Sequence, residues 1–167
     1  MSKDMTIYNM QILDAFDRGK RDALDLRERA DAMDGTAIIE EERKIPIFEP
    51  DKDYSSWKAG SPIRELVDGE YQVYKWITPI NTAYYPGFLP SKEPSICSLC
   101  HTKDPAKAKP YLAPNGTSGM YMMDEVCLKD DKLWKSIQDK NPYPPGEVGT
   151  EAYWEDVTDI EVDVVTA

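Results

Sequence analysis

The sequence predicts an α+β fold that is mostly β, with one N-terminal α-helix followed by two small antiparallel β modules. Three observations support this prediction. Residues 5–33 contain no proline and one glycine, which is typical of a helix. Most of the 13 prolines and 8 of the 9 glycines lie beyond residue 34, which is typical of short strands between turns. Two hairpin-like stretches in this second part resemble each other at an offset of 60 residues.

The change in composition also predicts how the chain is divided. At 167 residues, two modules would each have a thin core. We expect an anchoring or oligomerising helix with a connecting segment (1–50), a first carbohydrate-binding-like β module (51–100), a linker (101–119), a second such module (120–158) and a C-terminal tail (159–167).

The predicted helix carries an uncharged stripe at steps of three and four residues. The stripe consists of Met5, Asn9, Ile12, Phe16, Gly19, Ala23, Leu26, Ala30 and Met33. Asp34-Gly35 should end the helix with Gly35 as a left-handed C-terminal cap. The stripe is compatible with a helix that lies on its own domain, pairs with copies of itself, or docks on a larger assembly. Because three of its residues are small, self-association through this stripe alone would be weak.

The segment that follows the helix, "TAIIEEERKIPIFEP", is short, mixed in character and closed by prolines. It predicts a turn or one further helical turn, and then extended chain that leads to Tyr54 and Trp57. Beyond it, Asp68-Gly69 separates "IRELV" from "YQVYKWI", and Asp130-Asp131 separates "VCLK" from "KLWKSI". Both patterns predict β-hairpins, and Asp-Gly is the stronger turn signal.

The two hairpins belong to a longer repeat. "VYKWITPIN" (73–81) aligns with "LWKSIQDKN" (133–141), and both run into loops that contain Pro-Gly, at Pro86-Gly87 and Pro145-Gly146. The aligned pairs are Val73/Leu133, Tyr74/Trp134, Lys75/Lys135, Ile77/Ile137 and Asn81/Asn141. The second copy closes on Trp154, whose place in the first copy should fall within Ser95 to Cys97.

This pattern resembles carbohydrate-binding module families 5 and 12, also called type-3 chitin-binding domains. The second copy matches more closely, at Val126, Leu133, Trp134, Pro145 and Trp154. A leader helix with two such modules also resembles virion-associated proteins of tailed phages. The resemblance implies a non-enzymatic virion protein, made in the host cytoplasm, that adheres to host-surface glycan. It also implies contacts of the helix with other virion proteins, and a homo-oligomer. The alternative is a structural decoration, spacer or adaptor protein that is docked through its helix and does not bind sugar.

Aromatic residues of the modules are the candidate sugar contacts, because planar rings can stack on sugar faces. The candidates are Trp76, Tyr84, Tyr85, Tyr143 and Tyr153. The loop residues Tyr84, Tyr85 and Tyr143 are favoured, because loops on small scaffolds usually carry function. Strand alternation places Tyr74 and Trp76 on one face, which we expect to be the core face.

Charge and hydropathy exclude several classes of partner. A net charge of −11 repels phosphate backbones and anionic lipid, so nucleic acid and membrane surfaces are disfavoured. No apolar run approaches the roughly 18 residues that a membrane span requires. The N-terminus lacks the order of a secretory signal. The basic stretch "DPAKAKP" (104–110) is expected to be solvated linker or to contact an acidic neighbour.

The stretch "CSLCH" (97–101) spells the attachment motif of a c-type haem. Haem would also require export and a second axial ligand, and His101 is the single histidine. A zinc site would need Cys97, Cys100, His101 and Cys127, in an incomplete arrangement. We therefore expect buried structural thiols, no metal and no cofactor. No catalytic constellation is present in the sequence, so we expect a protein that is not an enzyme.

Overall fold

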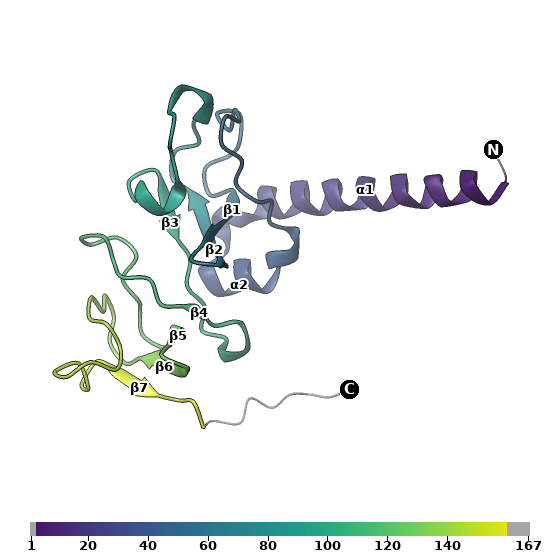
Figure 1. Cartoon of the computed structure of the whole chain (residues 1–167). Helices are drawn as coiled ribbons and strands as arrows, with labels where there is room; N and C mark the ends of the chain where they lie inside the picture. Colours follow the sequence, from purple (N-terminus) through teal and green to yellow (C-terminus); the bar gives the residue numbers. More distant parts are fainter. Residues whose placement is uncertain (1–2, 160–167) are drawn as a thin grey trace.

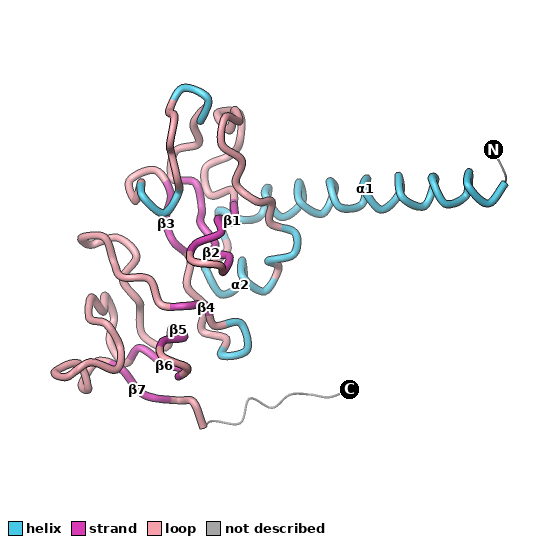
Figure 2. The backbone as a smooth tube through the Cα atoms, viewed as in Figure 1, coloured by secondary structure: helices cyan, strands magenta, loops and turns pink. Residues whose placement is uncertain are grey.

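The computed structural model describes residues 3–159 and confirms the α+β fold, with strands about as common as helices (Figure 1). A long N-terminal helix projects from a body that contains two small sheets, and the two sheets lie one after the other along the chain. Most of the chain in both modules forms loops (Figure 2). Within the described residues, no helix has the length and apolar character that crossing a bilayer requires.

The N-terminal helix α1 (Lys3–Arg29) is followed by a short 3-10 turn (Ala30–Ala32) and by a second helix, α2 (Gly35–Glu40). The predicted C-terminal cap is wrong. Asp34 instead caps the N-terminus of α2, where its Oδ1 accepts a hydrogen bond from the Ala37 N–H at 2.8 Å. Gly35 is needed for close packing rather than for a left-handed turn, because a Cβ there would lie 2.3 Å from the His101 carbonyl oxygen.

Only the C-terminal end of α1 packs on the body. Leu26 and Ala30 are fully buried, and Met33 packs against the same cluster. The partners of these residues are Ile38, Ile39, Ile45, Val73 and Cys100. The Arg27 guanidinium also lies 3.9 Å from the ring centroid of Trp57, a favourable cation–π geometry.

The N-terminal part of α1 lies away from the body (Figure 1). We call residues 5–16 the free segment of α1. Its exposed large side chains are Met5, Ile7, Tyr8, Met10, Ile12, Leu13 and Phe16. The predicted stripe is therefore divided: one end is buried in the chain's own core, and the other end is exposed.

The first sheet contains β1 (Pro62–Val67), β2 (Glu70–Trp76) and β3 (Cys97–Leu99), all antiparallel. Asp68 and Gly69 have φ values of 51° and 87°, the left-handed values of a type I′ hairpin turn. Ile47 adds an isolated parallel bridge to Arg64 of β1.

The second sheet contains β4 (Lys109–Pro110), β5 (Val126–Lys129), β6 (Lys132–Ser136) and β7 (Trp154–Asp156). The hairpin at Asp130-Asp131 is confirmed, with φ values of 53° and 59°. β4 runs parallel to β5, so this sheet is mixed rather than purely antiparallel. The parallel bridge at Ile47 is the matching feature of the first module.

Strand register supports the predicted repeat. Trp76 pairs with Cys97, and Ser136, 60 residues after Trp76, pairs with Trp154. Cys97 therefore takes the place of the closing Trp154, inside the predicted range. The first hairpin is longer, because β1 and β2 have 6 and 7 residues whereas β5 and β6 have 4 and 5.

The predicted linker 101–119 is exposed at Pro105, Ala106 and Lys107, but other parts of it are built into the body. It contributes β4 to the second sheet, and Tyr111 packs against the second core. The ammonium of Lys109, from the basic stretch, contacts the carboxylate of Glu42, and the Lys103 N–H donates to Thr36 Oγ1 at 2.9 Å. The prolines and lysines suggested solvation, but Pro110 lies in a two-residue edge strand, where a missing N–H is tolerated. The predicted tail begins within the described residues, but residues 160–167 lie outside them.

Candidate functional site

Equivalent loops leave the two sheets at Asn81 and Asn141. Each side-chain amide oxygen accepts a hydrogen bond from the N–H two residues later, at 3.0 Å in the first module and 3.2 Å in the second. These Asx turns start the loops in the same way. Gly87 and Gly146 then turn the chain with φ values of 80° and 77°, which only glycine adopts readily. The loop tyrosines of the two modules are therefore held by loops that start and turn in the same way.

In the first module, Tyr84 and Tyr85 border a pocket of about 580 Å³. Tyr84 is 79% exposed and Tyr85 56% exposed. The lining comprises Ile80, Tyr84, Tyr85, Pro86, Gly87, Phe88, Glu93, Ser95 and Ile96. Aromatic rings, a carboxylate and a hydroxyl together can stack on a ring-shaped ligand and also hydrogen-bond to its edge. We call this the tyrosine pocket.

In the second module, Tyr143 and Tyr153 stack on each other, with centroids 4.3 Å apart and planes at 24°. Tyr143 is 40% exposed and Tyr153 is half-buried. Trp154 Nε1–H donates to the Tyr143 carbonyl oxygen at 2.8 Å, which fixes the loop to the core. The structure therefore brings these two predicted residues together. Neither residue lines the tyrosine pocket of the first module.

Trp76 was expected among the sugar contacts, and the structure contradicts this. Trp76 is 1% exposed and packs against Tyr54 and Phe88, with centroid distances of 5.0 and 5.8 Å. Its indole N–H is buried without an acceptor within the described residues. Strand alternation had placed Trp76 on the core face, and that assignment is confirmed.

Sequence reasoning missed a second aromatic pocket, next to Trp134. This pocket of about 370 Å³ is lined by Trp134, Gly146, Glu147, Val148, Thr150, Glu151, Trp154 and Asp156. Trp134 is only half-buried, although its alignment with Tyr74 suggested a core position. Gly146 permits the loop to lie against the indole, because a Cβ there would be 2.9 Å from Trp134 Cζ2. The sequence feature that could have indicated this pocket is the alignment of Pro145-Gly146 with Pro86-Gly87.

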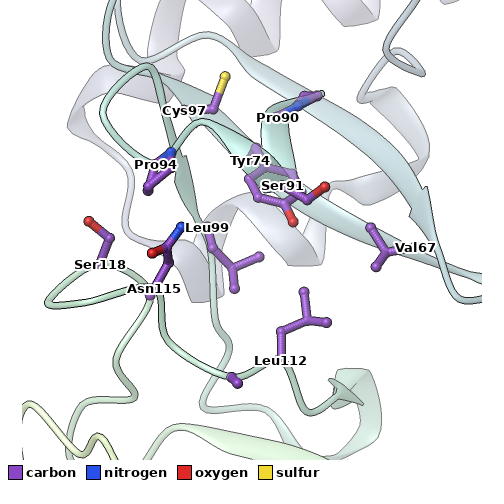
Figure 3. A pocket seen from close by; sticks show the side chains of 12 residues that line it. Val67, Tyr74, Pro90, Ser91, Pro94, Cys97, Leu99, Leu112, Asn115 and Ser118 are labelled. Carbon is purple, nitrogen blue, oxygen red and sulfur yellow. The ribbon is translucent and has the colours of Figure 1, made fainter. Parts of the chain in front are cut away.

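The first module has the matching pocket beside Tyr74 and Cys97 (Figure 3). There, Leu112, Asn115 and Ser118 from the segment 101–119 line one side of a pocket of about 140 Å³. The pocket beside Trp134 is larger, and residues 101–119 do not line it. The two copies therefore differ in volume and in lining.

The three thiols lie in different parts of the core. Cys100 packs with the α1 end, Cys97 with the aromatic cluster of the first module, and Cys127 with the core of the second. Burial raises the pKa of each thiol to about 12. Within residues 3–159, no group of three or more His, Cys, Asp or Glu is placed to hold a metal ion.

His101 packs between the modules rather than facing solvent. It is 8% exposed, its ring stacks on Tyr121 with centroids 3.6 Å apart, and Nε2 lies 2.9 Å from the Gly119 carbonyl oxygen. Burial lowers the pKa of His101 to about 4, although the contact with Gly119 opposes this shift. His101 is therefore a neutral packing residue at neutral pH.

Glu65 is the buried carboxylate of the first sheet. It is 6% exposed, and Ser91 lies beside its carboxylate without a hydrogen bond of standard geometry. Burial raises the pKa of Glu65, although Ser91 and the charge of Lys92 oppose this shift.

The chain was compared with protein-family models, curated proteins and solved structures. No family model, no curated protein and no solved structure matches the chain.

Proposed function

We propose that the chain is a non-enzymatic phage virion protein, on the tail or the particle surface, whose tandem modules adhere to host-surface glycan. The observation that carries the proposal is the tyrosine pocket. Tyr84 and Tyr85 present large exposed rings there, beside a carboxylate and a hydroxyl. The virion context rests on the sequence resemblance.

The chemistry of the tyrosine pocket suits a neutral sugar. Aromatic faces pack against the apolar face of a pyranose, while Glu93 can accept and Ser95 can donate or accept hydrogen bonds with its hydroxyls. A net charge of −11 disfavours strongly anionic polymers. We therefore propose a neutral host-surface polysaccharide as ligand class.

The second module supplies further aromatic contacts, through the stacked Tyr143 and Tyr153. The modules touch each other, since Gln72 Nε2–H donates to the Pro110 carbonyl oxygen at 2.9 Å. Two weak sugar contacts held by one body increase the apparent affinity for a polymer, because the second contact is intramolecular.

Retention of the full chain on chitin and cellulose beads, followed by a neutral glycan array, tests the proposal. Tyr84→Ala/Tyr85→Ala should weaken retention about tenfold or more, because each lost stacking ring contributes on the order of 1 kcal/mol. Tyr143→Ala should have a smaller effect. Tyr71→Ala, on the first sheet outside both pockets, is the matched control. Retention that is insensitive to the loop tyrosines would reject the proposed site.

The structural alternative is favoured by a different observation, the exposed apolar free segment of α1. In this alternative, α1 docks the chain on the particle and the modules act as spacers that bind no sugar. Absence of retention by the wild-type chain on every glycan would favour this alternative.

A further inference from the structure

The free segment of α1 has more apolar surface than the predicted stripe alone provides. Residues 5–13, "MTIYNMQIL", contain no charged residue, and their large side chains are 37–63% exposed. At 100° per residue, Ile7 and Met10 point away from the face that holds Met5 and Ile12. A helix that is apolar all round is normally buried by neighbours.

The exposed area is large enough for a stable interface. About half of each of the seven large side chains is exposed, on the order of 700 Å² when a full side chain presents about 200 Å². A standard interface takes about 800 Å² from each partner, whereas monomers rarely expose apolar patches beyond a few hundred Å². Burying the free segment would therefore supply most of the roughly 800 Å² that one partner contributes to a standard interface.

Helix propensity also indicates a partner. The run Thr6-Ile7-Tyr8-Asn9 consists of residues with low helix propensity, and within residues 3–159 every side chain of the free segment is exposed, so no core packing compensates. A short isolated helix is marginal in water. Packing against other helices would stabilise this part of α1.

The spacing of the exposed part of the stripe points to another copy of α1. Met5 and Ile12 are seven residues apart, as are Asn9 and Phe16, and the spacing continues to Gly19 and Ala23 before Leu26 and Ala30 enter the chain's own core. A strict seven-residue repeat is the period of helices that supercoil around each other with a left-handed twist. We propose that α1 self-associates through its free segment in a parallel bundle.

The length of the overlap favours the parallel orientation. Charged side chains are concentrated from Asp14 onwards, in "DAFDRGKRDALDLRER". In a parallel bundle the uncharged residues 5–13 pack on each other, and the seven-residue spacing can continue through Gly19 and Ala23, with the bodies together at one end. In an antiparallel pair centred on residue 9 the uncharged residues also meet, but the contact ends near residue 13, because a longer overlap would place them against the charged half of the partner. This inference concerns α1 and does not depend on glycan binding by the modules.

The molar mass of the full chain, measured by light scattering during gel filtration at micromolar concentration, tests self-association. We expect a multiple of the 19.0 kDa chain mass. Ile12→Asp/Phe16→Asp should reduce it to that of one chain. Arg21→Asp, on the opposite face of α1, should leave it unchanged. A wild-type mass of one chain would overturn the proposal, whatever the outcome of the glycan assays.

Orientation is tested by disulfide cross-linking under mild oxidation, since the three native thiols are buried. Met5→Cys lies on the stripe and should give an intermolecular disulfide, because residue 5 meets residue 5 in a parallel bundle. In an antiparallel pair centred on residue 9, the two copies of residue 5 would lie about 12 Å apart along the axis and should not cross-link. Arg21→Cys should not cross-link at a comparable rate. Equal rates for Met5→Cys and Arg21→Cys, or no cross-linking of Met5→Cys, would overturn the parallel bundle.

Discussion

Cys97 and Trp154 occupy the same position in the two modules, opposite Trp76 and Ser136 respectively. Both are buried, at 2% and 4% exposure. The side chains of Cys97 and Trp154 differ greatly in volume, and different neighbouring side chains fill the remaining core space in each module. The first module surrounds Cys97 with Trp76 and Phe88, whereas the second fills the space with the indole itself.

This relationship predicts unequal costs for truncation. Trp154→Ala removes a buried indole and its hydrogen bond to Tyr143, and should lower the free energy of unfolding by about 3–5 kcal/mol. Cys97→Ala removes one sulfur and should cost about 1 kcal/mol. Urea unfolding followed by circular dichroism measures both. Equal costs would show that the two positions are not packed as described.

Stability should depend on pH through His101. Its pKa is about 4 in the folded chain and about 6.5 when unfolded, so the unfolded state binds the proton more tightly. The His101 contribution is therefore complete above pH 6.5 and is lost as the pH falls toward 4. Between pH 8 and pH 5 it should remove about 2 kcal/mol from the free energy of unfolding.

Urea unfolding of wild type and His101→Gln at pH 8 and pH 5 isolates this effect, because the carboxylates are common to both proteins. The difference between the two pH values should shrink by about 2 kcal/mol in the variant. An unchanged difference would mean that His101 is accessible to protons in the folded chain.

Glu65 should have the opposite pH dependence. Its folded-state pKa is raised by burial, so the stability it contributes is present at low pH and is lost as the pH rises through that pKa. Glu65→Gln removes the charge and should raise the free energy of unfolding at pH 8 by about 1 kcal/mol or more. Glu70→Gln, exposed in the same hairpin, is the control and should change it by less than about 0.5 kcal/mol. A destabilised Glu65→Gln variant at pH 8 would reveal a partner for the ionised carboxylate.

The thiols should be unreactive in the folded chain. All 3 cysteines are buried, and their pKa values of about 12 leave almost no thiolate at pH 8. A colorimetric disulfide reagent at pH 8 should modify none of them in buffer and all 3 in urea. Rapid reaction in buffer would contradict the described packing.

Local patterns predicted the helix, both hairpins and the register of the repeat, because each depends on residues close in sequence. The prediction failed at Asp34, where an Asp-Gly pair is equally compatible with ending one helix and starting another. Gly35 instead allows the backbone of His101, which is distant in sequence, to lie against the start of α2. Likewise, β4 could not be recognised, since its two residues form a strand only beside β5.

The candidate site was predicted in part. Tyr84, Tyr85 and Tyr143 are exposed on loops, as loop position suggested. Trp76 is buried by Tyr54 and Phe88, which come from outside its hairpin. The core face of the first hairpin was inferred from the alignment of Tyr74 with Trp134. Tyr74 is buried, but Trp134 is only half-buried, and residues 112–119 line a pocket beside Tyr74 but not the pocket beside Trp134. This difference depends on the path of the connection between the modules, which strand patterns do not encode.

The passage of residues 101–119 through both halves has a consequence for dissection of the protein. A fragment that ends at residue 100 would lose the backbone of residue 101, which lies against Gly35 of α2, and a fragment that begins at residue 120 would lose an edge strand and Tyr111. Neither fragment would keep all of its core contacts. Because one connection is built into both halves, the separation of their outer loops is set by the fold itself.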